Sequence, residues 1–151
     1  NTKSANIVYY LNPTKFKYSN KIWYIYENHH WDELSESLSD LKNNIRYLKD
    51  LNDQMKNYYK NDVKYMKILQ SNEKELGSTS FINNVVTECV SLFEDKLFYK
   101  EIDSNVNLLG FKNGVYDLSD MKFRDGIPND NISIQINYNH NNQIFAYIQP
   151  I

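Results

Sequence analysis

The 151-residue sequence has few of the residues that build disulfides, metal sites and phosphate loops: one cysteine, four glycines and three prolines. A single cysteine, Cys89, excludes an internal disulfide and a zinc site made of cysteines, so we expect a reducing intracellular compartment. The sequence also lacks a run of ~18 apolar residues and an N-terminal signal pattern, which excludes a typical membrane-spanning helix. These absences predict a soluble protein with no membrane partner.

The scarcity of glycine also bears on nucleotide chemistry. A phosphate-binding loop needs a glycine-rich turn followed by Lys and then Ser or Thr, because backbone amides cradle the phosphates while the hydroxyl holds magnesium. None of the four glycines has that context: Gly77, Gly110, Gly114 and Gly126. We therefore predict no P-loop ATPase activity, no catalytic residue and no cofactor within these 151 residues.

Metal-binding patterns are equally sparse. The adjacent pair His29-His30 points in opposite directions on a strand or turn, and the third histidine, His140, is distant in sequence. Asp117 and Asp120 are the closest candidate pair for a two-metal site, but turn formation explains both carboxylates better. We predict no metal site, and we expect Cys89 to pack in a helix rather than act as a nucleophile.

Composition and charge indicate a folded domain. Hydrophobic residues make up 41% of the chain and aromatic residues 15%, enough to close a core, and the length fits one domain over residues 1–151. The chain starts without Met and ends without a closing element, so we expect a fragment of a longer protein. The formal net charge of −2 argues against a domain that mainly coats nucleic-acid phosphates.

Two short strands are expected near the N-terminus, at Ile7–Leu11 and Ile22–Tyr26, because both runs are rich in β-branched and aromatic residues. An aromatic cluster accompanies them in sequence. Packing in a small sheet is the plainer interpretation of this cluster, and a platform for stacked bases is the alternative. Its members are Phe16, Tyr18, Trp23, Tyr24, Tyr26 and Trp31.

The middle of the chain has helical periodicity. Apolar residues recur at spacings of three and four from Leu34 to Leu69, and Asp32 is a candidate N-cap. The pattern weakens over Asn57–Asp62, which predicts either one long helix or two helices joined there. A further helix is expected over Phe81–Glu94, capped by Ser78, Thr79 or Ser80.

A basic stripe runs beside the apolar positions of this middle region, displaced by roughly 100° around the helix. Two interpretations stay open: a solvated face whose lysine stems cover the core, and a ridge that contacts nucleic-acid phosphates. The candidate nucleic-acid-binding residues are Lys42, Arg46, Lys49, Lys56, Lys60 and Lys64, with Lys67 continuing the stripe.

Turn residues are densest toward the C-terminus. Asn113-Gly114 predicts a type I′ hairpin turn, because both residues tolerate positive φ, and a reversal at Ser119-Asp120 would return Met121–Arg124 as a third strand. Ile132–Tyr138 alternates apolar and polar residues, as in a half-buried strand. The predicted fold class is therefore α+β: a helical middle, short strands at the N-terminal end and a C-terminal β-hairpin or meander, whose strands could share a sheet with the N-terminal ones.

The C-terminal motifs also resemble a known family. The run Leu-Leu-Gly-Phe-Lys-Asn-Gly-Val-Tyr-Asp-Leu at residues 108–118, followed by Phe-Arg-Asp-Gly at 123–126, resembles the domain just N-terminal to the superfamily 3 helicase core of poxvirus-type helicase-primases. Similar domains occur in replication proteins of giant viruses, phages and plasmids. The resemblance extends upstream through Trp23–Tyr26 and residues 29–31, although Ser119-Asp120 stands where the family often has Thr-Gly.

The resemblance implies a position and a role. The domain would lie between a primase region and an AAA+ helicase, with residues 139–151 starting the linker and the ATP- and Mg²⁺-binding residues lying beyond Ile151. It would be a non-catalytic connector or collar in a viral DNA helicase-primase that assembles as a homo-hexamer. The alternative is a DNA-binding module that guides single-stranded or forked DNA to the helicase, in the host cytoplasm or at a viral replication site.

Overall fold

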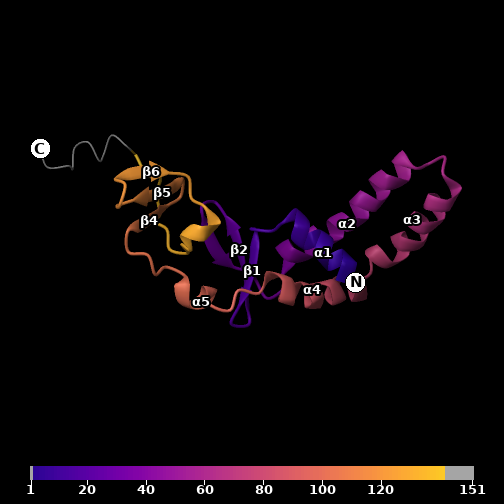
Figure 1. Cartoon of the computed structure of the whole chain (residues 1–151), viewed down its shortest axis with the longest axis horizontal. Helices are drawn as coiled ribbons and strands as arrows, with labels where there is room; N and C mark the ends of the chain where they lie inside the picture. The colour runs from indigo at the N-terminus through magenta and orange to yellow at the C-terminus, as the bar shows by residue number, and fades with distance from the viewer. Residues whose placement is uncertain (1, 142–151) are drawn as a thin grey trace, which may run out of the picture. The chain divides into compact units, whose positions relative to one another are not determined.

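The computed structural model describes residues 2–141, and these form two compact units. Unit 1 combines the chain up to Tyr18 with Leu34–Glu94, and unit 2 combines Ser19–Glu33 with the chain from Asp95 onward. The described elements confirm the α+β class, with helices in the middle of the sequence and strands near both ends (Figure 1). The two β-regions form separate three-stranded sheets, so the expectation of one shared sheet was wrong.

Unit 1 is mainly helical. The helices α2, Ser39–Tyr58, and α3, Val63–Leu76, are joined by a short turn, which decides for two helices rather than one. In Figure 1, α3 runs back along α2. The polar side chain of Asn52 is buried within the apolar stripe of α2, and its amide donates to the Leu69 carbonyl (3.0 Å). This bond fixes one helix against the other.

The first helix of unit 1 replaces a predicted strand. Residues Thr2–Leu11 form α1, so the strand expected at Ile7–Leu11 was wrong. Ala5 and Val8 are buried at helical spacing, and the Tyr9 ring meets Phe93 of the helix α4, Thr79–Phe93, edge-on (5.0 Å between centroids). Packing on another helix therefore overrides the local β preference of the sequence.

The start of α2 also differs from the prediction. Asp32 lies in strand β3, His30–Glu33, opposite Ile25, so it cannot cap a helix. The helix begins at Ser39 after Leu38, which has a left-handed backbone and makes no side-chain cap bond. The periodicity assigned Asp32 and Glu33 to the start of the helix, but both residues instead pair with strand β2, Ile22–Glu27.

The remaining long helix, α4 at Thr79–Phe93, matches the prediction closely. Its N-cap is Ser78, whose hydroxyl accepts a hydrogen bond from the Phe81 N–H (3.2 Å). Cys89 is fully buried on the apolar face of this helix, and burial raises the pKa of its thiol to about 12. Cys89 is therefore a packing residue rather than a thiolate nucleophile.

Aromatic side chains fill the core of unit 2. Trp31 is fully buried against Phe98, the first residue of the short helix α5 at Phe98–Glu101, and Phe98 meets Tyr24 of β2 edge-on (4.9 Å). Trp31 also donates its indole N–H to the Pro128 carbonyl (2.9 Å). In unit 1, Phe16, the first residue of β1 at Phe16–Ser19, is likewise buried. The burial of these rings favours the packing interpretation of the aromatic cluster over a base-stacking platform.

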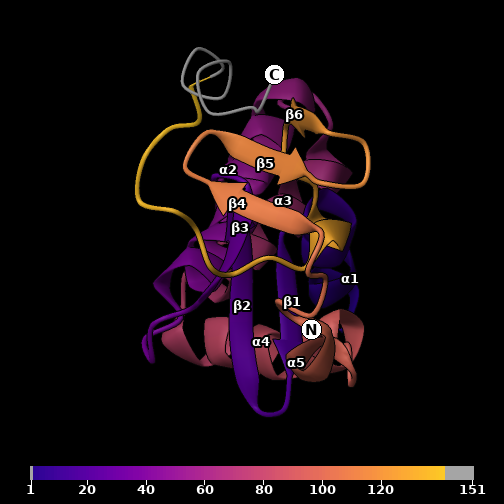
Figure 2. The same cartoon turned by 90° about the vertical axis from the view of Figure 1, so that its left-hand side faces the viewer.

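The second sheet is an antiparallel meander. Its strands are β4, Leu108–Phe111, β5, Gly114–Asp117, and β6, Lys122–Arg124, in that spatial order (Figure 2). Phe111 pairs with Gly114, so the two-residue loop is Lys112-Asn113, one residue earlier than predicted. Neither loop residue has positive φ, whereas Gly114 has φ +155° as the first residue of β5. The return of the third strand after Ser119-Asp120 is confirmed.

The strand predicted at Ile132–Tyr138 does not form. After the 3₁₀ turn Pro128–Asp130, this segment makes one isolated bridge with β4, in which the Ile136 N–H donates to the Gly110 carbonyl (2.7 Å). The N–H groups of Ser133 and Ile134 bond to the Asp103 carboxylate instead (2.7 and 3.2 Å). A side chain thus satisfies the donors that a ladder would have used.

Candidate functional site

The basic residues expected to bind nucleic acid divide between two antiparallel helices. Lys42, Arg46, Lys49 and Lys56 lie along one flank of α2, together with the acidic Asp53. Lys60 lies in the turn between the helices, and Lys64 lies in the first turn of α3. The stripe is therefore not one straight ridge. Whether these six residues bind nucleic acid stays a prediction.

One basic residue of the α2 flank has an acidic partner. The ammonium of Lys56 bonds to the Glu73 carboxylate of α3 (2.9 Å). That hydrogen bond raises the pKa of Lys56 and lowers the pKa of Glu73. Lys56 thus links the two helices, and this favours a structural role for at least one member of the predicted stripe.

The tip of the helix pair combines aromatic and basic side chains. Tyr58 is 82% exposed and meets Tyr59 edge-on (4.8 Å), while Tyr59 stacks on Tyr65 of α3 (4.7 Å, 18° between ring planes). Lys60 and Lys64, which follow Tyr59 and precede Tyr65 in the sequence, are exposed. The periodicity counted Tyr59 as one of the apolar positions between Leu34 and Leu69, and the contacts among the three rings at the helix turn were missed. The unused signal was the alternation of Tyr and Lys over residues 56–67.

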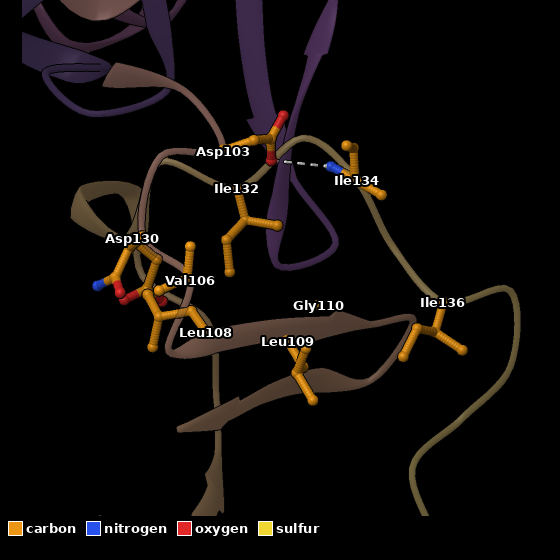
Figure 3. Close-up of a pocket in the computed structure, with 10 residues that line it drawn as sticks. Asp103, Val106, Leu108, Leu109, Gly110, Asp130, Ile132, Ile134 and Ile136 are labelled. Carbon is orange, nitrogen blue, oxygen red and sulfur yellow. Dashed lines mark hydrogen bonds between the residues drawn. The ribbon is translucent and has the colours of Figure 1, made fainter. Parts of the chain in front are cut away.

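Unit 2 contains a cleft of about 350 Å³ between β4 and the segment after the 3₁₀ turn (Figure 3). Its apolar lining includes Val106, Leu108 and Leu109 on one side and Ile132, Ile134 and Ile136 on the other. A Cβ at Gly110 would lie 2.6 Å from the Ile134 carbonyl oxygen, so the absence of a side chain there permits the close approach of the segment. The cleft suits apolar packing rather than acid–base chemistry.

The two carboxylates of this cleft are already occupied. Asp103 receives the Ser133 and Ile134 N–H groups, one of them drawn in Figure 3, and also the Ser133 hydroxyl. Asp130 is buried and accepts two bonds from the Arg124 guanidinium (2.8 Å each) and one from the Ile127 N–H (2.9 Å). Neither carboxylate is placed to act as a general base.

Tyr26 lies close to this ion pair. Burial, followed by the negative charge of Asp130, raises the pKa of its hydroxyl to about 12. The phenol therefore stays protonated at neutral pH and has no role as a base.

The other candidate ligands also have local partners. Asp117 accepts from the Ser119 N–H (2.9 Å), a turn bond, and its second oxygen lies 3.8 Å from Arg124. His29 Nδ1 accepts from the Gly126 N–H (3.0 Å), and His30 Nε2 lies 2.9 Å from the Asp32 carboxylate. Across residues 2–141, no three His, Cys, Asp or Glu side chains gather as a metal site would require.

His140 is a packing residue that sequence reasoning overlooked. His140 is 9% exposed, and its ring stacks on Phe123 of β6 (4.3 Å between centroids, 11° between ring planes). Its backbone exchanges two hydrogen bonds with the Asn113 side chain (2.8 and 3.3 Å). The Asn113 side chain therefore holds the segment around His140 against the hairpin loop. The proposed linker start at 139–151 falls mostly outside the described residues.

The comparisons with known proteins decide the family. The model of the family described as D5 N terminal like matches residues 5–146, nearly the whole chain. The chain belongs to the D5 N-terminal-like family. This confirms the resemblance of the sequence to the N-terminal domain of viral helicase-primases.

Two viral relatives of this D5 N-terminal-like chain carry helicase names. It is 31% identical over 137 residues to "Putative helicase L207/L206" of Acanthamoeba polyphaga mimivirus, covering 80% of this chain and 14% of the relative. It is 41% identical over 68 residues to "Putative helicase 022R" of Frog virus 3, covering 45% of this chain and 7% of that relative. The chain thus spans less than a sixth of the length of either relative. Within residues 2–141, no helix is both long and apolar enough to cross a membrane.

Proposed function

We propose that this chain is the non-catalytic connector of a viral DNA helicase, supporting assembly of a hexamer beside the helicase domain of the same protein. The family membership and the helicase names of both relatives support a role in replication. ATP and Mg²⁺ would bind in the downstream helicase domain, since the described residues hold no phosphate loop. The protein would act inside the infected cell, in the host cytoplasm or at a viral replication site.

An exposed apolar groove carries this proposal. It has a volume of about 220 Å³ and lies in unit 1 between α1, α2 and α3. Ile7 and Met55 line it and are each 45% exposed, and Leu48, Leu51 and Leu76 complete its apolar wall. Clustered exposed apolar side chains mark protein–protein contacts more often than isolated ones do. A neighbouring copy in the ring is the occupant that we propose.

The test uses the full-length parent protein. Ile7→Gln together with Met55→Gln should shift the hexamer toward smaller species in light scattering after size exclusion, because both polar side chains would enter the contact. Val106→Gln is the matched control, since Val106 is exposed and belongs to unit 2 rather than to the unit that holds the groove. Unchanged melting temperatures of the 151-residue variants establish that they fold. A hexamer that persists in the folded double variant would contradict the proposal.

The alternative function, a module that guides DNA, is favoured by the exposed tyrosines and lysines at the α2–α3 tip rather than by the whole basic stripe. A continuous phosphate ridge is less well supported, because its residues divide between two helices and Lys56 pairs with Glu73.

A further inference from the structure

The tip of the α2–α3 helix pair, residues 56–67, has a charge unlike that of the chain. It holds four lysines and one aspartate, a local charge of +3, whereas the whole sequence has a net charge of −2. The basic residues are Lys56, Lys60, Lys64 and Lys67, and the acidic residue is Asp62. A concentrated positive charge at one end of a helical unit favours an anionic partner.

The single acidic residue of the tip is committed to the fold. The Asp62 carboxylate accepts hydrogen bonds from the N–H groups of Lys64 and Tyr65, both at 3.1 Å, and so caps α3. A carboxylate at a helix N-terminus is directed at backbone donors and at the positive end of the helix dipole. Lys60, Lys64 and Lys67 are exposed, whereas Lys56 is bonded to Glu73.

The three tyrosines of the tip contact one another through their rings. Tyr59 and Tyr65 stack on each other across the turn, and the ring of Tyr58 rests edge-on against Tyr59. The T-shaped contact leaves a ring face of Tyr58 available, consistent with its 82% exposure. An exposed aromatic ring with basic residues near it in sequence matches the chemistry of single-stranded nucleic acid, because a base can stack on the ring while lysines meet the flanking phosphates.

We propose that the α2–α3 tip binds single-stranded nucleic acid, with Tyr58 stacking on a base and Lys60, Lys64 and Lys67 contacting phosphates. A duplex fits less well, because its base faces are covered by neighbouring base pairs. The site is separate from the apolar groove of the proposed connector and does not depend on that function. Failure of one test therefore leaves the other standing.

The experiment measures fluorescence anisotropy of a labelled thymidine 15-mer with the 151-residue chain at low salt. Tyr58→Ala should weaken binding by roughly 5-fold to 100-fold, the range that loss of one base–aromatic stack gives. Tyr58→Phe should retain binding, since the ring remains. Tyr47→Ala is the matched control, because Tyr47 is an exposed tyrosine elsewhere on α2. The affinity of this variant for the strand should stay within about twofold of that of the original chain, a change much smaller than the loss of one base–aromatic stack causes.

Two further arms separate stacking from simple charge attraction. An abasic 15-mer has the same phosphates but no bases. The original chain should bind it more weakly than the thymidine strand, whereas the Tyr58→Ala variant should bind the two strands about equally. Changing Lys60, Lys64 and Lys67 to Gln should lower the salt slope by about 2, at roughly 0.7 per phosphate contact, whereas changing Lys42, Arg46 and Lys49 to Gln should not.

Each other outcome overturns the proposal. Equal binding of the abasic and base-bearing strands would show charge attraction without stacking, and stronger loss in the Lys42, Arg46 and Lys49 variant would place binding on the α2 flank. Binding to anionic phosphatidylserine vesicles in preference to the strand would indicate a membrane surface. No strand binding at low salt would exclude the site outright. Circular dichroism confirms that each variant is folded.

Discussion

At the residue scale, Gly114 is the position where the backbone depends most on the absence of a side chain. Its φ is +155°, and a Cβ would lie 2.5 Å from the Arg124 carbonyl oxygen and 2.7 Å from the Phe123 ring. The sequence pattern identified this glycine but placed it inside the turn. The pattern could not show that β6 approaches it, because that contact depends on the register of a third strand.

Gly114→Ala should therefore lower the free energy of unfolding by at least about 1 kcal/mol, since strain and a steric clash add. Gly77→Ala is the control, because that glycine has a negative φ and its nearest neighbour to an added Cβ is 3.9 Å away. Urea denaturation of the 151-residue chain measures both. Equal stability of the two variants would show that β6 does not pack against Gly114. Asn20→Ala would be an unsuitable control, because Asn20 has φ +50° and the substitution there adds backbone strain of its own.

His140 gives a pH-dependent prediction. Burial lowers the pKa of its imidazole below the usual value near 6.5, so the native state binds fewer protons than the unfolded state as the medium becomes acidic. Stability contributed by the neutral ring is present above pH 6.5 and declines as the pH falls through 6.5. His140→Phe should keep the stacking on Phe123 and reduce the decline between pH 7 and pH 5, as measured by thermal melts. A parallel pH profile for the variant would rule out His140 as the titrating group.

At the scale of the element, periodicity predicted the helices well where caps and stripes agreed. The helix α4 and the break between α2 and α3 follow from the sequence, because Ser78 and the polar run near residue 60 are local signals. The helix α1 and the segment after Asp130 do not. Their conformations depend on a distant helix and on the Asp103 carboxylate, which no local pattern contains.

The cap of α4 allows a prediction at this scale. Ser78→Ala should cost about 1 kcal/mol of unfolding free energy, because the Phe81 N–H loses its acceptor. Ser80→Ala should cost much less, since Ser80 was an alternative cap in the sequence but lies inside the helix. Chemical denaturation of both variants decides between them. A larger loss for Ser80→Ala would place the helix start two residues later.

At the scale of the whole molecule, the candidate site was predicted only in part. The sequence located the basic residues, but their division between two helices and the braced tyrosines required the turn at residues 59–62. The family resemblance could be identified from the turn motifs at residues 108–118 and 123–126, and the family match over residues 5–146 confirms it.

The purified 151-residue chain should release no phosphate from ATP, with or without DNA, because the described residues hold neither a phosphate loop nor a metal cluster. A colorimetric phosphate assay with Mg²⁺ tests this, and a mock purification provides the background. Turnover above that background, abolished by substituting a residue of this chain, would overturn the proposal that the chain is non-catalytic.

The path of the chain between the two units has a consequence for biosynthesis. Unit 2 is assembled from two stretches of sequence, and the first, Ser19–Glu33, is translated before most of unit 1. The ring of Trp31 contacts Tyr26, which precedes it in the chain, but its other partners Phe98, Pro128 and Ile132 leave the ribosome later. A gene fragment that starts at residue 95 therefore encodes only part of unit 2, because it lacks Ser19–Glu33. In a nascent chain halted near residue 94, the contacts of Trp31 with these three later residues are still missing.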